Sequence, residues 1–356
     1  MKKIVKYLLF IIIAINLLIL ISGKSWIYKA ISITYLKGHT SSYIHDFVHF
    51  PANTIEAGTH QEWLIAKDYN KANLPEFIKP INKELETVAF LVIINDSITY
   101  EEYWHGYSED SASNSFSMSK SYISTLVGVA IKDNIINIDQ KVCDFLPEYC
   151  GEKEKLLTIK NLLTMSSGLN WNESYYNPLG KIAEAYYGNN LKKLVMNLKV
   201  IEPPGKVFKY YSCNTQLLAF ILESVTGKSI NEYASEKLWI PMGAKHPALW
   251  NTDKKEGDEK AFCCINSNAR DFARIGKLYM NNGNWNGTQI IDSTYVSQAT
   301  SAADLLDEEG NKNLNYGYQF WITNYNGLKI YYARGLWGQY VICIPEKDMI
   351  VGRLGR

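Results

Sequence analysis

The N-terminal stretch of the chain is almost continuously apolar. Met1-Lys2-Lys3 opens it, and the run from Tyr7 to Ile21 is interrupted only by Asn16. A basic start followed by about fifteen to eighteen apolar residues is typical of a membrane-targeting segment, with a length between a secretory signal and a full span. No Ala-x-Ala site follows, so we favour an uncleaved anchor over residues 1–23, while a cleaved signal and a secreted protein remain the alternative.

The basic residues before this run place the start of the chain on the cytoplasmic side and the bulk of it on the extracytoplasmic side, either periplasmic or at the cell surface. Residues 24–85 follow with Pro51, Pro75 and Pro80 and little periodicity. They are predicted to form a stalk or an irregular layer that packs on the main domain.

Apolar runs predict strands at both ends of the remaining chain. Thr87–Ile94 continues through the turn Asn95-Asp96 into a returning strand from Ser97 to Trp104. Near the C-terminus, two further hairpins are predicted, which pair 318–323 with 328–333 and 340–344 with 349–354.

Helical spacing dominates between these strands. Residues 122–131 predict a buried helix, and the block from about 138 to 290 is mainly helical. Within that block we expect helices at 159–165, 191–198, 216–225 and 269–280. The order of elements predicts an α+β fold over residues 86–356. Its first and last strands should share one antiparallel sheet, with the helical block beside it and a cleft where the 122–131 helix meets both.

Composition narrows the partners. Lys+Arg is 37 and Asp+Glu is 36, which leaves a net charge of +1 and no basic excess for nucleic acid. The six cysteines form no Cys-x-x-Cys pair, and no His-Glu-x-x-His occurs, so neither a metal nor another cofactor is predicted. Cys143 and Cys150 flank a short apolar segment and are either a disulfide outside the cytoplasm or two buried thiols.

The candidate chemistry begins with Ser117-Met118-Ser119-Lys120, where small polar residues run into the 122–131 helix. Residues three apart on a helix share a face, so the Lys120 amine can reach the Ser117 hydroxyl. A serine hydroxyl is a poor nucleophile until a neighbouring base takes its proton, and this spacing supplies both partners. Taken alone, the same residues are equally typical of a capping serine and a solvated lysine.

Two more stretches carry candidate groups. In Pro204–Asn214, a turn leads into aromatic residues before a helix, and a phenol there is a plausible proton shuttle. In Tyr332–Gln339, two glycines flank a tryptophan at the end of a strand, which is typical of a tight bend or of a backbone N–H directed at an oxyanion.

In order and spacing, these pieces resemble the penicillin-recognising serine hydrolases. That family contains class C β-lactamases, D-Ala-D-Ala carboxypeptidases, related esterases and the 6-aminohexanoate-oligomer hydrolases. The resemblance covers residues 86–356 and is closest to the last subgroup. It is carried by Ser117–Lys120, Leu162–Leu169, Phe208–Ser212 and Gly335–Gln339 before the Pro345 turn.

The resemblance implies a serine β-lactamase-like fold and a serine hydrolase of esterase or amidase type. Ser117 would be acylated, Lys120 would take its proton, and Tyr210 would relay a proton to the leaving group. The backbone N–H groups of Ser117 and Leu336 would form the oxyanion hole. The small-molecule ester, amide or cell-wall-type substrate would meet a further set of residues: Tyr175, Ser212, Arg334, Gly335 and Trp337.

Two departures from the family pattern limit what is carried over. Tyr210 is followed two residues on by Ser212, where many relatives have asparagine, so Tyr211 remains a second candidate for the phenol. Ala333-Arg334-Gly335 replaces the usual Lys-Thr-Gly or His-x-Gly element. The carboxylate-binding cation is therefore lost or supplied by Arg334, which weakens a β-lactamase function. The same loss leaves open a non-catalytic, penicillin-binding-like sensor or cell-wall binding module. A Ser-His-Asp hydrolase is disfavoured, because no Gly-x-Ser-x-Gly occurs.

Overall fold

The computed structural model describes residues 2–71 and 74–356. Its helices are α1 Lys2–Ile21, α2 Trp26–Ile33, α3 Ile78–Glu84, α4 Ser119–Lys132, α5 Ile159–Leu163, α6 Lys181–Tyr187, α7 Leu191–Met196, α8 Ser212–Thr226, α9 Ile230–Ala234, α10 Ala269–Met280 and α11 Ser293–Ala299. Its strands are β1 Ala52–Ile55, β2 Leu64–Ile65, β3 Thr87–Ile94, β4 Ser97–Tyr103, β5 Ser113–Asn114, β6 Ala248–Asn251, β7 Ile265–Ser267, β8 Asn284–Trp285, β9 Thr288–Gln289, β10 Trp321–Tyr325, β11 Leu328–Gly335, β12 Gln339–Ile344 and β13 Met349–Gly355.

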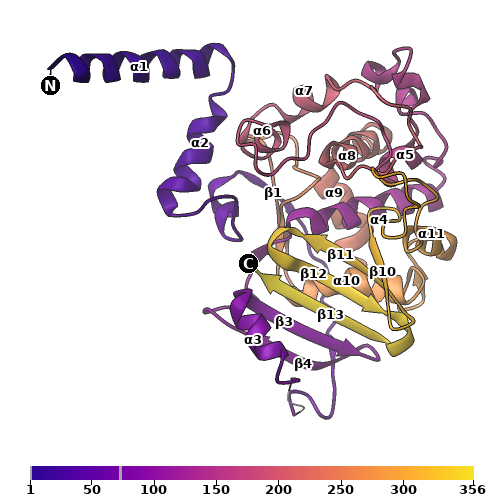
Figure 1. The fold of residues 1–356 in the computed structure, drawn as a ribbon. Coiled ribbons are helices and arrows are strands. Elements are labelled where there is room, and N and C mark those ends of the chain that lie inside the picture. Colours follow the sequence, from indigo (N-terminus) through magenta and orange to yellow (C-terminus); the bar gives the residue numbers. More distant parts are fainter. Residues whose placement is uncertain (1, 72–73) are drawn as a thin grey trace.

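The main sheet joins the two ends of the domain, as the strand pattern predicted. Its order is β10-β11-β12-β13-β3-β4-β2, and β13 pairs antiparallel with β3 from Met349 opposite Ile94 to Leu354 opposite Ala89. Buried and half-buried residues alternate along most of β3, which is what a strand covered on one face requires. Figure 1 shows the yellow C-terminal strands beside the magenta β3 and β4, with α10 behind them and most of the helices above.

Helix α4 runs through the centre of the molecule. Every residue from Ser119 to Ala130 is buried, so the helix is packed all round, as its apolar and small side chains allow. It contacts α8 on the helical side and β11 on the sheet side. Gly128 permits the close approach of α11, because a Cβ there would lie 2.7 Å from the Tyr295 ring.

A second sheet ties the region between α1 and the main domain to the centre. Its order is β1-β6-β7-β5, so β1 of the 24–85 region pairs with β6, while β5 directly precedes the Ser117 turn. The part of the 24–85 region that contains β1 therefore packs on the main domain.

The helix boundaries differ from the expected ones mainly at α8, which begins at Ser212 and not at residue 216. Polar residues in its first turn hide the start from a search for apolar spacing. The helix ends as expected at Gly227, whose φ of 67° is the left-handed conformation of a C-cap glycine.

Two disulfides are present among the described residues. Cys143 and Cys150 are bridged, which resolves the two alternatives for that pair. The bond between the adjacent residues Cys263 and Cys264 was not predicted.

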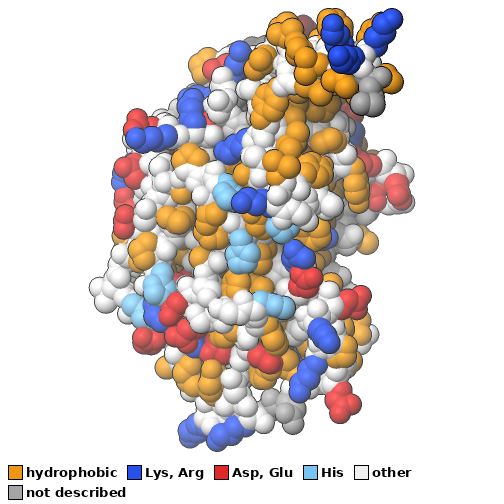
Figure 2. Space-filling view, turned by 90° about the vertical axis from the view of Figure 1, so that its left-hand side faces the viewer, with side chains coloured by type: hydrophobic (Ala, Val, Ile, Leu, Met, Phe, Trp, Pro, Cys, Tyr) orange, Lys and Arg blue, Asp and Glu red, His pale blue; other side chains and the backbone are white. Residues whose placement is uncertain are grey.

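Helix α1 differs from every other helix in its exposure. None of its residues is buried, and it is the one helix of the described chain that is long and apolar enough to cross a membrane. Figure 2 shows its hydrophobic side chains gathered at the top of the molecule with basic side chains at the near end. A signal sequence passes the same test, so the helix suggests either a membrane anchor or a signal.

Candidate active site

The Ser117 turn connects β5 to α4. Ser117 lies in a single 3₁₀ turn, Phe116–Met118, which runs straight into the first residue of α4. Lys120 Nζ lies 2.9 Å from Ser117 Oγ and donates to the Phe262 carbonyl at 2.8 Å. The lysine side chain is 1% exposed. The hydrogen bond to the Phe262 carbonyl fixes the position of the Lys120 amine and so orients the amine toward Ser117.

Burial lowers the pKa of Lys120 into a range where the amine can act as a general base. It lowers the pKa of the amine to about 8, although the negative charge of Glu173 opposes the change. A lysine with this pKa is partly neutral near pH 8 and can then accept a proton.

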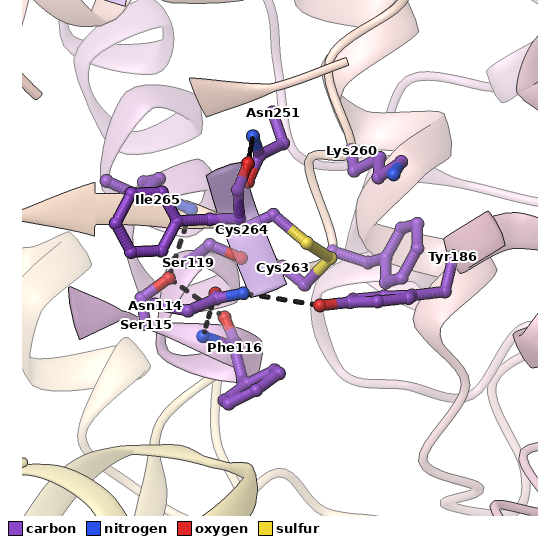
Figure 3. The surroundings of a disulfide bond; sticks show 12 residues. Asn114, Ser115, Phe116, Ser119, Tyr186, Asn251, Lys260, Cys263, Cys264 and Ile265 are labelled. Atoms are coloured by element: carbon purple, nitrogen blue, oxygen red, sulfur yellow. Dashed lines mark hydrogen bonds between the residues drawn. A yellow bond between two sulfur atoms is a disulfide. The ribbon is translucent and has the colours of Figure 1, made fainter. Parts of the chain in front are cut away.

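The segment that carries Phe262 is held against the Ser117 turn on both sides. Ser119 Oγ donates to the Ala261 carbonyl at 2.9 Å. Ser115 N donates to the Ile265 carbonyl at 2.8 Å, and Ile265 N donates back to Ser115 Oγ at 3.1 Å. The Cys263–Cys264 disulfide lies between these attachments in the sequence, and Figure 3 shows it next to Ile265.

Tyr210 approaches the serine from the loop before α8. The centre of its ring lies 5.1 Å from Lys120 Nζ. Burial raises the pKa of this phenol above its ordinary value, and the interaction with nearby Ser117 does not reverse the shift. The group therefore stays protonated at neutral pH. Tyr316 and Trp321 pack against the ring, with centroids 5.9 and 5.4 Å away.

The end of β11 reaches the same turn through a glycine. A Cβ on Gly335 would lie 2.1 Å from the Ser115 carbonyl, so no larger residue fits without moving the strand. This approach brings the following residue, Leu336, next to the Ser117 turn. Trp337 is in the left-handed region with a φ of 62°, and its indole donates to the Ser42 carbonyl at 2.8 Å.

The substrate-binding candidates are divided between exposed and buried positions. Tyr175 and Trp337 are 52% and 41% exposed, and the Tyr175 phenol donates to Glu173 at 2.8 Å. Arg334 is exposed, and its guanidinium lies 5.4 Å from the centre of the Trp321 ring. Ser212 is 1% exposed and uses both its N–H and its hydroxyl as donors to Glu173.

Glu173 is the functional candidate that the sequence patterns missed. Its carboxylate accepts hydrogen bonds from Trp171 Nε1 at 2.6 Å and from the Tyr175 phenol at 2.8 Å, in addition to those from Ser212. The acidic side chain thus links the N-terminus of α8 to the Tyr175 loop. Its only sequence signal is its place in Asn-Trp-Asn-Glu, shortly after Ser166-Ser167-Gly168.

A sheet of terminal strands that is antiparallel except for its edge strand β2, with a Ser-x-x-Lys turn at its junction with a helical block, defines the serine β-lactamase class. Residues 74–354 match the Beta-lactamase family, and the chain belongs to that family. It has the serine β-lactamase-like α+β fold, and it belongs to a family of hydrolases.

Two of the most similar proteins bear the name of the subgroup that the motifs resemble. The chain is 26% identical over 327 residues to the 6-aminohexanoate-dimer hydrolase of Paenarthrobacter ureafaciens, a match that covers 84% of this chain and 80% of that protein. The structure of a candidate 6-aminohexanoate-dimer hydrolase from Bacillus anthracis superposes with a TM-score of 0.77 at 24% identity, over 88% of this chain and 87% of that one. A class C β-lactamase variant gives a TM-score of 0.58 at 16% identity, over 78% and 89% of the two chains.

Proposed function

We propose that the chain is a membrane-anchored serine hydrolase that cleaves an ester or amide bond through an acyl-enzyme on Ser117. The observation that carries the proposal is the 2.9 Å contact between Lys120 Nζ and Ser117 Oγ, made by an amine whose pKa burial lowers to about 8. A buried amine of this kind can be neutral at the start of the reaction and accept the serine proton as the oxygen attacks.

The remaining steps use groups around the same oxygen. Neutral Lys120 takes the proton from Ser117 as Oγ bonds to the substrate carbonyl carbon. The backbone N–H groups of Ser117 and Leu336 stabilise the resulting oxyanion. Tyr210, protonated because burial raises its pKa, gives its proton to the leaving amine or alcohol as the scissile bond breaks. Lys120 returns a proton to the phenolate, and water then hydrolyses the ester on Ser117 by the same groups in reverse.

Linear amides and short esters are the proposed substrates. The relative from Paenarthrobacter ureafaciens is named a 6-aminohexanoate-dimer hydrolase, which supports this choice. Tyr175, Ser212, Arg334, Gly335 and Trp337 are proposed to contact or shape the site for the substrate. Of these, Arg334 offers the positive charge and Tyr175 an exposed phenol, while Ser212 acts through Glu173.

The decisive experiment uses the full chain in detergent with a fluorophosphonate probe and a panel of short esters, linear amides, D-amino-acid amides and nitrocefin. Labelling of Ser117 together with repeated turnover of an ester or amide supports the proposal, and Ser117→Ala should abolish both. Labelling without turnover would instead support the sensor alternative. Turnover by the Ser117→Ala protein would overturn the proposal.

The membrane part of the proposal rests on the exposed, apolar helix α1. It predicts that the protein stays in the membrane fraction after alkaline carbonate extraction and keeps its N-terminus, as intact mass would show. Release of a shortened protein into the soluble fraction would establish the cleaved signal instead.

A further inference from the structure

A buried carboxylate lies in the segment that follows the membrane helix. Asp46 begins a short 3₁₀ turn, Asp46–His49, and is 0% exposed. The Tyr186 hydroxyl, from α6, lies 2.8 and 2.9 Å from the two carboxylate oxygens. The Tyr43 amide also donates to this carboxylate, at 3.3 Å. Burying a carboxylate this completely is costly unless its hydrogen bonds are satisfied, and the family-type chemistry proposed above makes no use of it.

Hydrogen bonds continue from Asp46 to the residue before the nucleophile. Asn114 Nδ2 donates to the Tyr186 hydroxyl at 3.3 Å, and Asn114 Oδ1 accepts from the Phe116 amide at 2.8 Å. Figure 3 shows Asn114 between Tyr186 and Phe116, with both bonds drawn. Asn114 is 0% exposed, so these bonds face no competition from bulk water.

Phe116 needs such a restraint. Its φ of 44° is in the left-handed region, where a residue with a side chain is strained. The conformation sets the direction in which the Ser117 turn and α4 leave β5, and with it where Ser117 and Lys120 lie relative to groups from other parts of the chain. The bond from the Phe116 amide to Asn114 Oδ1 stabilises that conformation directly, and Tyr186 and Asp46 fix the orientation of the Asn114 amide.

The same segment also contacts the opposite side of the site. The Ser42 carbonyl accepts a hydrogen bond from the Trp337 indole at 2.8 Å, and the Ile44 carbonyl accepts one from the backbone N–H of Asn114 at 3.4 Å. Residues 42–46 therefore touch both β5, which leads into the Ser117 turn, and the loop that follows Gly335.

We propose that Asp46 is a positioning residue for the nucleophile turn, acting through Tyr186 and Asn114 on the Phe116 amide. The inference rests on the proposed function of Ser117. It extends the catalytic apparatus to residues 42–46, in the segment that follows α1 and α2.

The test uses the full chain in detergent and compares Tyr186→Phe with Tyr187→Phe. The Tyr186 change removes the hydroxyl that joins Asp46 to Asn114, whereas the Tyr187 change removes a hydroxyl from the next position of the same helix, outside this chain of bonds. The rate at which the fluorophosphonate phosphonylates Ser117, with release of fluoride, is expressed per titrated site, so that a loss of folded protein does not count. Tyr186→Phe is expected to lower the maximal rate about tenfold without changing the probe concentration that gives half of it, and Tyr187→Phe should leave the rate within twofold.

A conservative pair sharpens the assignment. Asp46→Asn keeps an oxygen that can accept from Tyr186 and is expected to stay within about threefold of the wild-type rate, whereas Asp46→Ala should match Tyr186→Phe. Equal losses in Asp46→Asn and Asp46→Ala, or a per-site rate in Tyr186→Phe within twofold of wild type, would overturn the proposal.

A second measurement does not depend on catalysis. Hydrogen exchange of the peptide that covers residues 113–119 should become several-fold faster in Tyr186→Phe and Asp46→Ala, and unchanged in Tyr187→Phe. If the wild-type chain fails to react with the probe while exchange behaves in this way, the proposed function falls and the positioning stands. Unchanged exchange in both variants would reject the positioning role whatever the activity.

Discussion

Two lysines in this molecule are fully buried, and they differ in what surrounds the amine. Lys120 is 1% exposed and contacts two oxygens, Ser117 Oγ and the Phe262 carbonyl. Lys260 is 0% exposed, and among the described residues its Nζ has no hydrogen-bond partner. It lies instead over the Phe50 ring, 3.5 Å from the centroid, and 5.2 Å from that of Tyr186.

Burial lowers the pKa of both amines, but the consequences differ. The Lys120 pKa of about 8 leaves both protonation states accessible near neutral pH, and its oxygen partners aim it at one atom. The pKa of Lys260 is well below its ordinary value, but among the described residues no hydroxyl lies within hydrogen-bond distance of its Nζ. Burial alone therefore does not make a lysine a catalytic base. The amine also needs a fixed hydrogen-bond acceptor that orients it and a hydroxyl close enough to give up its proton.

The largest expected effect comes from replacing the oriented amine. Lys120→Met keeps the length and apolar stem of the side chain but removes the base, and should lower kcat/KM by about a thousandfold. Per-site acylation measured with an activated ester checks this. A loss below tenfold would show that another group takes the Ser117 proton.

The pH profile gives the next largest effect. Because the neutral form of Lys120 is the active one, kcat/KM should fall about tenfold per unit as pH drops below about 8. A stopped-flow profile from pH 5.5 to 9.5 would show this limb. A flat profile through this range would contradict the role of Lys120.

Replacing Glu173 should change both kcat and the pH below which kcat/KM falls. Its charge raises the pKa of Lys120 against the effect of burial, so Glu173→Gln should move the limb to lower pH. It also weakens the contacts to Trp171 and Tyr175, and we expect a loss of about tenfold in kcat. Glu202→Gln, which removes a half-exposed carboxylate paired with Lys209, is the matched control and should leave the limb in place.

The smallest effect on activity is expected at the other buried amine. Lys260→Met should keep kcat/KM within about threefold while raising the free energy of unfolding by about 1 to 2 kcal/mol at pH 7. Because burial lowers the pKa of Lys260 in the folded chain, the unfolded chain binds more protons at pH values between the two pKa values, so the free energy of unfolding rises with pH there. The gain from the substitution should therefore shrink between pH 7 and pH 10, as urea melts at the two pH values would show. A stability loss at pH 7 would mean that Lys260 contributes to the fold as a charged group.

Much of the architecture could be predicted because it is written in short-range patterns. The hairpin through Asn95 and Asp96 has both residues at positive φ, which suits their types, and β3 and β13 both carry runs of apolar residues. Helix α10 begins and ends at the expected residues, because a strong apolar stripe lies between Asn268 and the Asn281-Asn282-Gly283 stop. The start of α8 escaped prediction, since Ser212 and the residues after it are polar but buried by contacts with distant groups such as Glu173.

What the sequence by itself determined is the pairing of Ser117 with Lys120, because residues three apart on a helix meet whatever the rest of the chain does. Only the tertiary structure decided what surrounds that pair. Phe262 lies 142 positions after Lys120 in the sequence, and Tyr186 lies 140 positions after Asp46, to which its hydroxyl donates. Contacts of that kind depend on how the sheet, the helical block and the segment after α1 pack together. No local pattern of hydrophobic and polar residues records which distant groups that packing will join.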